Sequence, residues 1–445
     1  MGELFGTDGI RGVANEYPMT VDLALRVGKA SADYFRDKSK IVIGKDTRLS
    51  GDMIASAVMD GICASGTDAI YVDTMPTPGV SYLTTLYGAD AGIVISASHN
   101  PYYDNGIKLF KSNGFKLLDK EEIALEQIIL NNQKVSSTHI GEAGKVIYRK
   151  DASENYINFL ASRISSKFSL KGIKIAMDCS NGATYQVAPE LFAELGANIH
   201  PICITPDGRN INDGCGSQHL NLLTEKVLEI GADIGIAFDG DGDRLVAVDE
   251  KGNTVTGDKI LLICGQYLKS KNELRNNRIV STVMSNFGLG VALRKLDIAH
   301  TITDVGDRYV LEEMINSGAV LGGEDSGHLI FLNDHTTGDG LLAALKLIEA
   351  MISMDRPISD LSSQMTVYPQ VLLNVTVSQK LDIDAIPVIS DAIKDIETRL
   401  GEKGRVLVRY SGTQPLCRVM VEGEDARETE QYCHELSEII KNSIG

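Results

Sequence analysis

The chain has 445 residues, which at roughly 150 residues per domain gives about three or four domains, each able to bury a hydrophobic core without disulfides. Its composition, 43% hydrophobic and 23% charged residues, excludes a disordered or collagen-like chain. The formal net charge of −17 disfavours nucleic acid and anionic membranes as partners, so an anionic substrate requires a local cluster of cations.

The cysteine pattern and the N-terminal residues bear on the cellular compartment. Seven cysteines are scattered along the chain without a CxxC pair, which favours reduced thiols in the cytoplasm. The first residues lack the apolar stretch of a signal peptide, and no apolar run reaches about 18 residues. We therefore expect a cytoplasmic chain without a membrane span.

Short apolar runs alternate with Gly-rich polar clusters and amphipathic stretches of helical length, a pattern typical of α/β layers. The predicted strands include 41–44, 92–96, 173–177, 233–238, 278–283 and 406–410. The predicted helices include 21–37, 52–65, 120–132, 153–168, 183–195, 257–270, 287–296, 338–354, 384–400 and 426–441. A long alternating strand over 366–379, followed by one helix, two strands and a closing helix, predicts a smaller α+β domain.

The change of pattern along the chain suggests four domains. We place them at 1–150, 151–253, 254–365 and 366–445, with boundaries at predicted turns and at the restart of a helical pattern. The predicted fold class is α/β, with three similar α/β domains followed by a smaller C-terminal α+β domain.

The segment GIVISASHNPYYDNGIKLF carries the first chemical signal. Its apolar strand ends in small residues around Ser98, which is followed by His99 and Asn100. Ligands of open α/β sheets collect at such strand ends, so Ser98 is a candidate nucleophile or phosphate acceptor, with Lys108 as a nearby cation. The alternative is an ordinary hydrogen-bonded loop.

The segment AFDGDGDRLVAVDE places Asp239, Asp241 and Asp243 at alternating positions after a buried strand pattern. Three carboxylates on one turn repel each other unless a hard cation lies among them, and all-oxygen ligation selects Mg²⁺ or Ca²⁺. An EF-hand loop is disfavoured because its sixth position would be Arg244 rather than Gly. A solvated acidic turn is the remaining alternative.

The segment LGGEDSGHLIF offers groups suited to sugar hydroxyls. Glu324, Ser326 and His328 follow a predicted strand, and His328 is also able to move protons near neutral pH. A turn with a satisfied histidine is the alternative for this segment. Further polar groups at strand ends are Arg11, Asp307 and Arg308, each of which is by itself a common solvated charge.

The segment VRYSGTQPLCRVMVEG predicts an anion pocket between two strands. Hydroxyl groups, an exposed backbone amide and guanidinium groups match a phosphate with several acceptor oxygens. A hairpin with incidental arginines is the alternative. The residues in question are Arg409, Ser411, Gly412, Thr413 and Arg418.

With these four clusters in this order, the chain resembles the α-D-phosphohexomutase family over essentially its whole length. FGTDGIRG at the start and the segments 178–189, 206–219, 305–310 and 336–345 resemble most closely the bacterial branch that acts on glucosamine phosphates. The resemblance implies four domains around one central cleft, a mobile last domain and a homodimer.

The resemblance also implies residue roles. The catalytic group is Ser98, phosphorylated in the active enzyme, with His99, Lys108, Arg11 and His328, of which the last three assist proton transfer. One Mg²⁺ per chain is bound by Ser98, through its phosphate, and by Asp239, Asp241 and Asp243. The substrate-binding residues are Gly306, Asp307, Glu324, Ser326, Arg409, Ser411, Gly412, Thr413 and Arg418. The chain departs from the family at Gln414, where Glu is usual, and at Asp325, where this branch more often has Gln.

The implied reaction moves a phosphoryl group from Ser98 to glucosamine 6-phosphate. The resulting glucosamine 1,6-bisphosphate turns over and returns its 6-phosphoryl group to Ser98, releasing glucosamine 1-phosphate for amino-sugar and peptidoglycan precursors. Glucosamine 1,6-bisphosphate or glucose 1,6-bisphosphate is the implied primer. A phosphomannomutase or phosphoglucomutase remains an alternative, as does a metal- or phosphosugar-binding protein without turnover.

Overall fold

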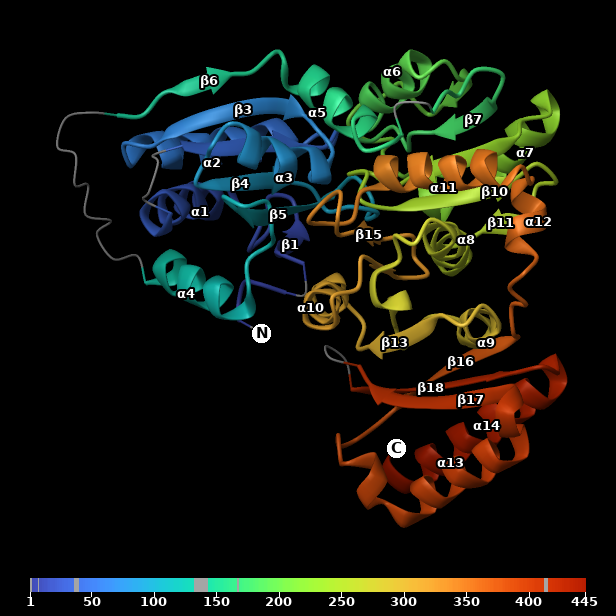
Figure 1. The fold of residues 1–445 in the computed structure, drawn as a ribbon. Coiled ribbons are helices and arrows are strands. Elements are labelled where there is room, and N and C mark those ends of the chain that lie inside the picture. Colours follow the sequence, from blue (N-terminus) through green and yellow to red (C-terminus); the bar gives the residue numbers. More distant parts are fainter. Residues whose placement is uncertain (1, 7, 36–39, 132–142, 166–167, 412–414) are drawn as a thin grey trace. The chain divides into compact units, whose positions relative to one another are not determined.

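The computed structural model describes residues 2–6, 8–35, 40–131, 143–165, 168–411 and 415–445 (Figure 1). Contacts within the chain divide it into two units, which are described separately. Unit 1 comprises Met1–Val283 and Ala299–Ser362, and unit 2 comprises Met284–Ile298 and Ser363–Gly445.

The first sheet of unit 1 is mixed and contains six strands in the order β1-β5-β4-β2-β3-β6. Strands β4, β2, β3 and β6 are parallel, whereas β5 runs antiparallel to both β4 and β1. The strands are β1 (Ile10–Val13), β2 (Lys40–Lys45), β3 (Asp68–Thr74), β4 (Ala91–Ile95), β5 (Asp104–Lys111) and β6 (Val146–Tyr148). The helices of this part are α1 (Val21–Tyr34), α2 (Gly51–Ala64), α3 (Thr77–Leu86) and α4 (Asp119–Leu130).

The core of this layer depends on a close crossing of α1 and α2. A Cβ atom at Gly28 would lie 2.1 Å from the Val58 carbonyl oxygen, so the two helix backbones approach as closely as glycine allows. The Thr20 hydroxyl accepts a hydrogen bond from the Leu23 backbone N–H and caps the start of α1. Ile93 and Ile95 of β4 belong to the same hydrophobic core as Val58, so the strand that precedes the Ser98 loop is anchored in this layer.

The second sheet of unit 1 has the order β11-β10-β9-β7-β8. Strands β8, β7 and β9 are parallel, and β9 and β10 form an antiparallel hairpin in which Phe238 pairs with Leu245. The residues between these two form the aspartate loop. The elements are α5 (Ala152–Ala161), β7 (Lys174–Asp178), α6 (Val187–Glu194), β8 (Asn198–Ile202), η1 (Gly216–Gln218), α7 (Asn221–Ile230), β9 (Ile234–Phe238), β10 (Leu245–Asp249) and β11 (Thr254–Val255).

The third sheet of unit 1 has the order β13-β12-β14-β15, with only the β14–β15 pair antiparallel. The turn between β14 and β15 carries Glu324 and Ser326. The elements are α8 (Gly257–Ser270), η2 (Arg275–Asn277), β12 (Arg278–Thr282), β13 (Ala299–Thr303), α10 (Asp307–Ser317), β14 (Leu321–Gly323), β15 (Leu329–Phe331), α11 (Gly340–Met354) and α12 (Ile358–Ser362).

Unit 2 contains a three-stranded antiparallel sheet in the order β16-β18-β17. Helices α13 and α14 pack on this sheet and share its hydrophobic core, which includes Val419 and Leu436 (Figure 1). The elements are α9 (Phe287–Lys295), β16 (Gln370–Thr376), η3 (Ile383–Ala385), α13 (Pro387–Leu400), η4 (Gly401–Lys403), β17 (Gly404–Tyr410), β18 (Leu416–Gly423) and α14 (Ala426–Ile444). The predicted order of strand, helix, two strands and closing helix is confirmed.

Among the predicted elements, three are shorter by four residues or more. The helix predicted over 153–168 ends at Ala161, where Ser162 turns its hydroxyl back to the Phe159 carbonyl oxygen. The helix predicted over 183–195 begins at Val187, because Ser180 and Asn181 have positive φ and the chain first makes turns. The strand predicted over 366–379 forms over 370–376.

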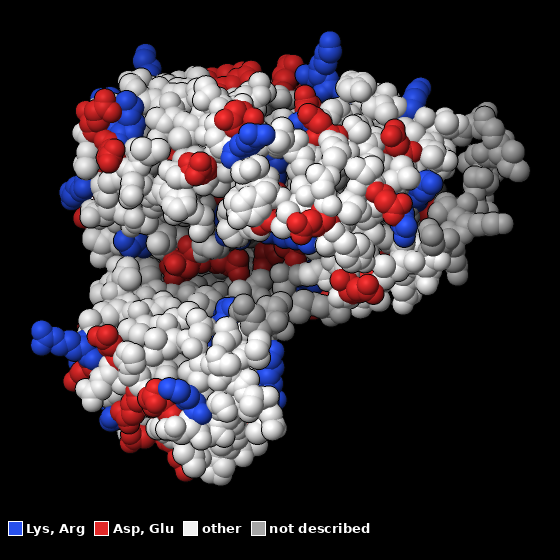
Figure 2. All heavy atoms as spheres, turned by 180° about the vertical axis from the view of Figure 1, so that it is seen from behind, with Lys and Arg blue, Asp and Glu red and all other residues white. Residues whose placement is uncertain are grey.

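On the face shown in Figure 2, lysine and arginine side chains are interspersed with aspartate and glutamate. None of the described helices has the length and apolar content needed to cross a membrane. Because the charges on the face in Figure 2 are of mixed sign, we expect the cations that bind an anionic substrate to lie inside the fold, among the loops at the strand ends.

Candidate active site

Ser98 lies in the loop that follows β4 and is 1% exposed. Its φ of 53° is in the left-handed region, which a non-glycine residue adopts only when its surroundings enforce it. Part of that enforcement comes from the Ser98 N–H, which donates to the Ser96 hydroxyl at 2.9 Å. The Ser96 hydroxyl in turn donates to Asp46 at 2.6 Å.

Two side chains from outside the loop hold its carbonyl groups. The Arg48 guanidinium donates to the carbonyl oxygens of Ser98 at 2.9 Å and Asn100 at 2.8 Å. The Asn212 amide donates to the same two oxygens at 2.9 and 3.1 Å. Arg48 follows a strand of the first sheet and Asn212 follows a strand of the second, so both sheets hold the strained loop in place.

The aspartate loop lies directly against Ser98, whose hydroxyl donates to Asp239 Oδ2 at 2.5 Å. Asp239 and Asp241 are completely buried and Asp243 is 4% exposed. Gly240 permits this approach, because a Cβ atom there would lie 2.6 Å from the Ser98 carbonyl oxygen. The glycine spacing of the DGDGD motif is thus a packing requirement as well as a matter of turn geometry.

The three carboxylates are suited to a hard cation. One carboxylate oxygen from each of the three aspartates lies within 4.8 Å of the other two. Asp241 Oδ1 and Asp243 Oδ1 are buried and have no hydrogen-bond partner within the described part of the chain. Burial and repulsion by the two neighbouring carboxylates raise the pKa of Asp239 well above its usual range. Mg²⁺ would pair with the free oxygens and remove this repulsion, so the residues present fit the ion.

Lys108 on β5 is the cation closest to the triad. Its ammonium lies 2.8 Å from Asp241, 3.3 Å from Asp243 and 3.1 Å from Asp8. Burial by itself would lower the pKa of Lys108, but the attraction of these carboxylates raises it well above its usual value. Burial likewise opposes ionisation of Asp241, yet the Lys108 charge and hydrogen bonds from Lys108 and Thr77 bring the pKa of Asp241 below its usual value.

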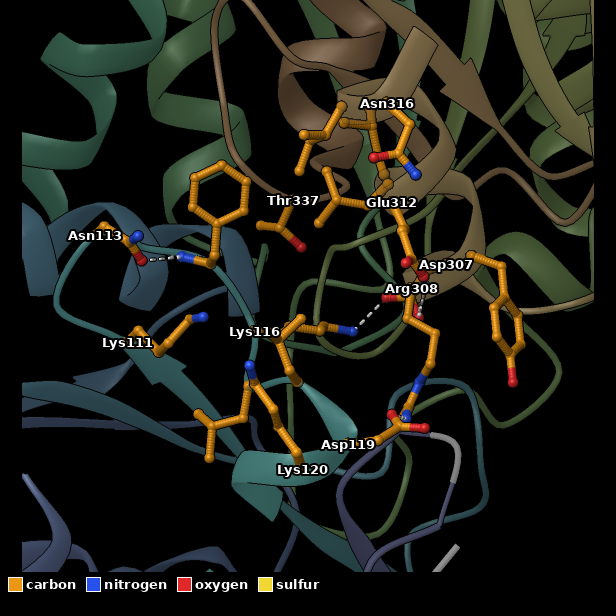
Figure 3. A pocket seen from close by; sticks show the side chains of 17 residues that line it. Lys111, Asn113, Lys116, Asp119, Lys120, Asp307, Arg308, Glu312, Asn316 and Thr337 are labelled. Atoms are coloured by element: carbon orange, nitrogen blue, oxygen red, sulfur yellow. Dashed lines mark hydrogen bonds and ion pairs between the residues drawn. The ribbon is translucent and has the colours of Figure 1, made fainter. Parts of the chain in front are cut away.

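The charge network continues toward the third sheet. The Lys116 ammonium contacts Asp8 at 2.7 Å and also Asp307 at the start of α10. Figure 3 shows the Lys116 side chain in contact with Asp307, and both residues line a pocket of about 690 Å³. Asp307 in turn lies 3.7 Å from His328 Nε2. A continuous path of ionisable groups therefore joins the triad to the predicted sugar loop.

His99 and Arg11 flank Ser98. His99 Nδ1 lies 3.4 Å from the Ser98 hydroxyl oxygen. Burial, followed by the charges of Arg244 and Arg11, lowers the pKa of His99 to about 4, so its imidazole is neutral at pH 7. Arg11 pairs with Asp8 at 2.5 Å and reaches the Ala97 carbonyl oxygen at 3.5 Å.

The predicted sugar loop is joined to the aspartate loop through the backbone. Arg244 and His328 form an isolated antiparallel bridge, and the Leu245 N–H donates to the Gly327 carbonyl oxygen at 3.0 Å. The Gly306 N–H donates to Glu324 Oε1 at 3.1 Å. These contacts bring together two segments about 85 residues apart in sequence, as the catalytic interpretation requires.

Several polar atoms of this region are available to a ligand. Ser326 Oγ, both ring nitrogens of His328 and Arg244 Nε are buried and lack hydrogen-bond partners among the residues described. Buried polar atoms are normally paired, so such a group of them marks a place for solvent or substrate.

The predicted phosphate segment belongs to unit 2. Arg409 on β17 stands directly opposite Arg418 on β18. Two like charges opposite each other destabilise a hairpin, which an anion between them would relieve. Arg418 Nε is buried and finds no hydrogen-bond partner in the described ranges, and Ser411 is 2% exposed. Gly412 and Thr413 lie outside the described residues.

The sequence pattern did not identify four side chains that build the site. Asp8 and Lys116 link the triad to Asp307, Thr77 donates to Asp241 at 2.6 Å, and Asn212 holds the Ser98 loop. Thr77 is the first residue of α3, whereas Asp8, Lys116 and Asn212 lie in loops. The polar strand-end pattern at Asp8 was the only available signal, because the other three depend on how the layers pack.

The chain is similar to known proteins in both sequence and fold. Models of the four phosphoglucomutase/phosphomannomutase domains match residues 2–136 (α/β/α domain I), 154–252 (domain II), 256–368 (domain III) and 372–439 (C-terminal domain). The chain belongs to this family. It is made of three α/β domains and a smaller C-terminal domain, as predicted.

Individual relatives agree with the family assignment. A protein of Syntrophus aciditrophicus (strain SB) named phosphoglucosamine mutase is 54% identical over 449 residues, covering all of both chains. A solved phosphoglucomutase/phosphomannomutase family protein from Burkholderia thailandensis has a TM-score of 0.81 at 24% identity, covering 99% of this chain and 98% of that one. N-acetylphosphoglucosamine mutase of Aspergillus fumigatus, solved with GlcNAc-6P and magnesium, has a TM-score of 0.66 at 17% identity, covering 99% and 96%.

Proposed function

We propose that this chain is a phosphohexomutase that interconverts glucosamine 6-phosphate and glucosamine 1-phosphate through a phosphoserine at Ser98. The observation that carries the proposal is the contact of 2.5 Å between the Ser98 hydroxyl and a buried triad of carboxylates, with the Lys108 ammonium beside them. The choice of an amino sugar rests on the relatives named phosphoglucosamine mutase, which are 54% and 51% identical over their full length.

The proposed first step transfers a phosphoryl group from phosphorylated Ser98 to the O1 hydroxyl of glucosamine 6-phosphate. The bond between phosphorus and Ser98 Oγ breaks as the bond to O1 forms, and the O1 proton passes to a base of the site. The protonated Lys108 lies where it offsets negative charge on the transferring group. Mg²⁺ bound by Ser98, Asp239, Asp241 and Asp243 would supply further positive charge at the same place.

The proposed second step reverses the roles after glucosamine 1,6-bisphosphate has turned over. Ser98 Oγ attacks the 6-phosphoryl group and loses its proton, for which Asp239 Oδ2 at 2.5 Å and the neutral His99 Nδ1 at 3.4 Å are within reach. Glu324 and Ser326 would bind sugar hydroxyls, and Gly306 and Asp307 would complete that subsite. The non-reacting phosphate would be bound by Arg409, Ser411, Gly412, Thr413 and Arg418, with proton transfer assisted by Arg11 and His328.

The decisive experiment combines a substrate comparison with a serine variant. Purified protein, Mg²⁺ and glucose 1,6-bisphosphate as primer should convert glucosamine 6-phosphate faster than glucose or mannose phosphates. Ser98→Ala should abolish this turnover while its circular dichroism spectrum and melting temperature stay like those of wild type. Ser50→Ala, outside the loop, is the matched control. Full activity of Ser98→Ala would eliminate the phosphoserine mechanism, and faster mannose or glucose turnover would assign a different substrate.

Three further properties belong to the same proposal. We place the protein in the cytoplasm, where cellular reductants maintain thiols, because all seven cysteines are free. We keep domain limits near residues 150, 253 and 365, which limited proteolysis can test. A homodimer remains a prediction for analytical ultracentrifugation.

A further inference from the structure

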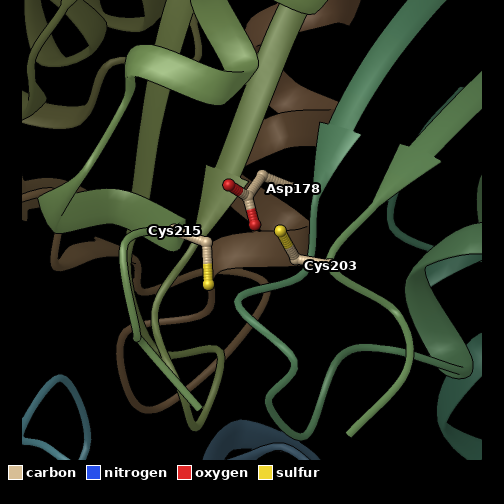
Figure 4. A group of neighbouring side chains, drawn as sticks. All are labelled: Asp178, Cys203 and Cys215. Atoms are coloured by element: carbon tan, nitrogen blue, oxygen red, sulfur yellow. The ribbon is translucent and has the colours of Figure 1, made fainter. Parts of the chain in front are cut away.

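A second cluster of potential metal ligands lies in unit 1, separate from the aspartate triad. Asp178 ends β7, Cys203 follows β8, and Cys215 precedes η1. One carboxylate oxygen and the two sulfur atoms all lie within 4.8 Å of one another, and Figure 4 shows the three side chains gathered between these strand ends. The scattered cysteine spacing gave no indication of this arrangement.

We propose that Asp178, Cys203 and Cys215 form a binding site for a thiophilic divalent cation of the Zn²⁺ class, separate from the aspartate triad. Two thiolates and a carboxylate are a ligand set that selects Zn²⁺ over Mg²⁺, whereas the all-oxygen triad has the opposite preference. The two sites therefore do not compete for the same ion.

The distances are compatible with metal ligation after small movements. Zn–S and Zn–O bonds of about 2.3 and 2.1 Å in a tetrahedron place neighbouring ligand atoms about 3.5–3.8 Å apart. The cluster is within about 1 Å of that spacing, which a rotation of the two cysteine side chains about χ1 is able to supply. The fourth position would be taken by water, because Cys203 is only partly buried and gives access from solvent.

Hydrogen bonds from the surroundings already orient two of the ligands. The two Asp178 oxygens accept hydrogen bonds from the backbone N–H groups of Ser180 and Gly216, both at 2.8 Å. The Asn181 amide points at Cys215 Sγ from 3.9 Å. Donors of this kind orient metal ligands and compensate their charge, so the cluster has the outer hydrogen bonds that metal sites require.

Occupancy of the site would also stiffen the support of the Ser98 loop. The Ser180 carbonyl oxygen accepts a hydrogen bond from the Asn212 N–H at 2.9 Å, and the Asn212 side chain holds the Ser98 carbonyl oxygen. A cation that joins the ends of β7 and β8 to the loop before η1 would thus limit the movement of Asn212. The expected role is structural, with thermal protection as its main consequence.

The test is a titration of the reduced full-length protein with Co²⁺ in excess Mg²⁺, which keeps the aspartate triad occupied. We expect one Co²⁺ per chain with a thiolate charge-transfer band in the near ultraviolet, and its displacement by Zn²⁺. Cys203→Ser should lose the band and weaken Co²⁺ binding by about 100-fold or more, since even outer-shell changes cost roughly 10–100-fold. Cys215→Ser should behave likewise, and Cys63→Ser should match wild type.

Three results would overturn the proposal. One is the absence of a charge-transfer band in wild type although thiol titration finds all seven cysteines reduced. Another is a band that Cys203→Ser leaves intact. If Cys215→Ser does not fold, Cys203→Ser still decides, because Cys203 is partly exposed and serine is isosteric there. A protein that forms a Cys203–Cys215 disulfide on mild oxidation, but takes up no metal when reduced, would also contradict the site.

Discussion

Replacement of Arg48 by lysine tests whether a buried guanidinium positions the catalytic loop. Arg48 is 2% exposed, and its Nε donates to Asp46 at 2.8 Å. The two terminal nitrogens donate to four carbonyl oxygens of the Ser98 loop and the start of β5. Lysine has the same charge but three donors on one nitrogen, so it cannot reach Asp46 and all four carbonyl groups together.

The magnitude follows from the acceptors that would be left unpaired. At least two buried acceptors would lose their partner at about 1–3 kcal/mol each. Breaking a buried ion pair typically costs about 3–5 kcal/mol in total, so we expect Arg48→Lys to destabilise unit 1 by about 4 kcal/mol. With an unfolding entropy of about 2.1 cal/mol/K per residue over the whole of unit 1, the melting temperature should fall by about 5 °C.

The catalytic effect should be separable from the loss of stability. A displacement of Ser98 by about 1 Å lowers the rate by about 100-fold, so kcat should fall by that factor at a temperature where the variant is fully folded. The KM for glucosamine 6-phosphate should change little, because Arg48 does not face the sugar loop. Arg149→Lys, at an exposed pair with Asp151, is the control and should leave both kcat and melting temperature near wild type. A folded Arg48→Lys variant with wild-type kcat would refute the positioning role.

Three other changes have defined outcomes. Burial lowers the pKa of His335 to about 4, from 6.5 in the unfolded chain. The unfolded state therefore binds a proton first as the pH falls. Between pH 7 and pH 5 this protonation lowers the free energy of unfolding by about 2 kcal/mol. Urea unfolding of His335→Gln should show a correspondingly smaller loss over that interval, and an identical loss would contradict the assignment. Gly28→Ala should lower the melting temperature. Overpacking against the Val58 carbonyl group costs about 1–3 kcal/mol, which exceeds the helix-propensity gain of about 1 kcal/mol. A rise in melting temperature would show that α1 and α2 separate freely. Chelation of Mg²⁺ should stop turnover, and added Mg²⁺ should restore it. Asp241→Asn should lower the Mg²⁺-dependent rate by orders of magnitude. An unchanged rate in this variant would discredit the triad as a metal site.

The sequence pattern identified most of the secondary structure near the site because the relevant information is local. Buried strands appear as apolar runs, and helix α8 was predicted with its observed limits at residues 257 and 270. Helices α3, α7, α10 and α12 were not among the predicted ranges. Their apolar faces are short or interrupted by Pro78 and Thr224, so the 3.6-residue period is weak there.

The sequence by itself determined the α/β class and the order of the four polar segments, and it predicted a hard cation at the aspartate triad. These follow from residue type and spacing within a single loop. The tertiary structure alone decided that Lys108 and Lys116 share Asp8, that Asn212 supports Ser98, and that two cysteines twelve residues apart face Asp178. Such contacts join loops of different strands, and which loops meet depends on strand order and register across whole sheets, information that no short segment contains.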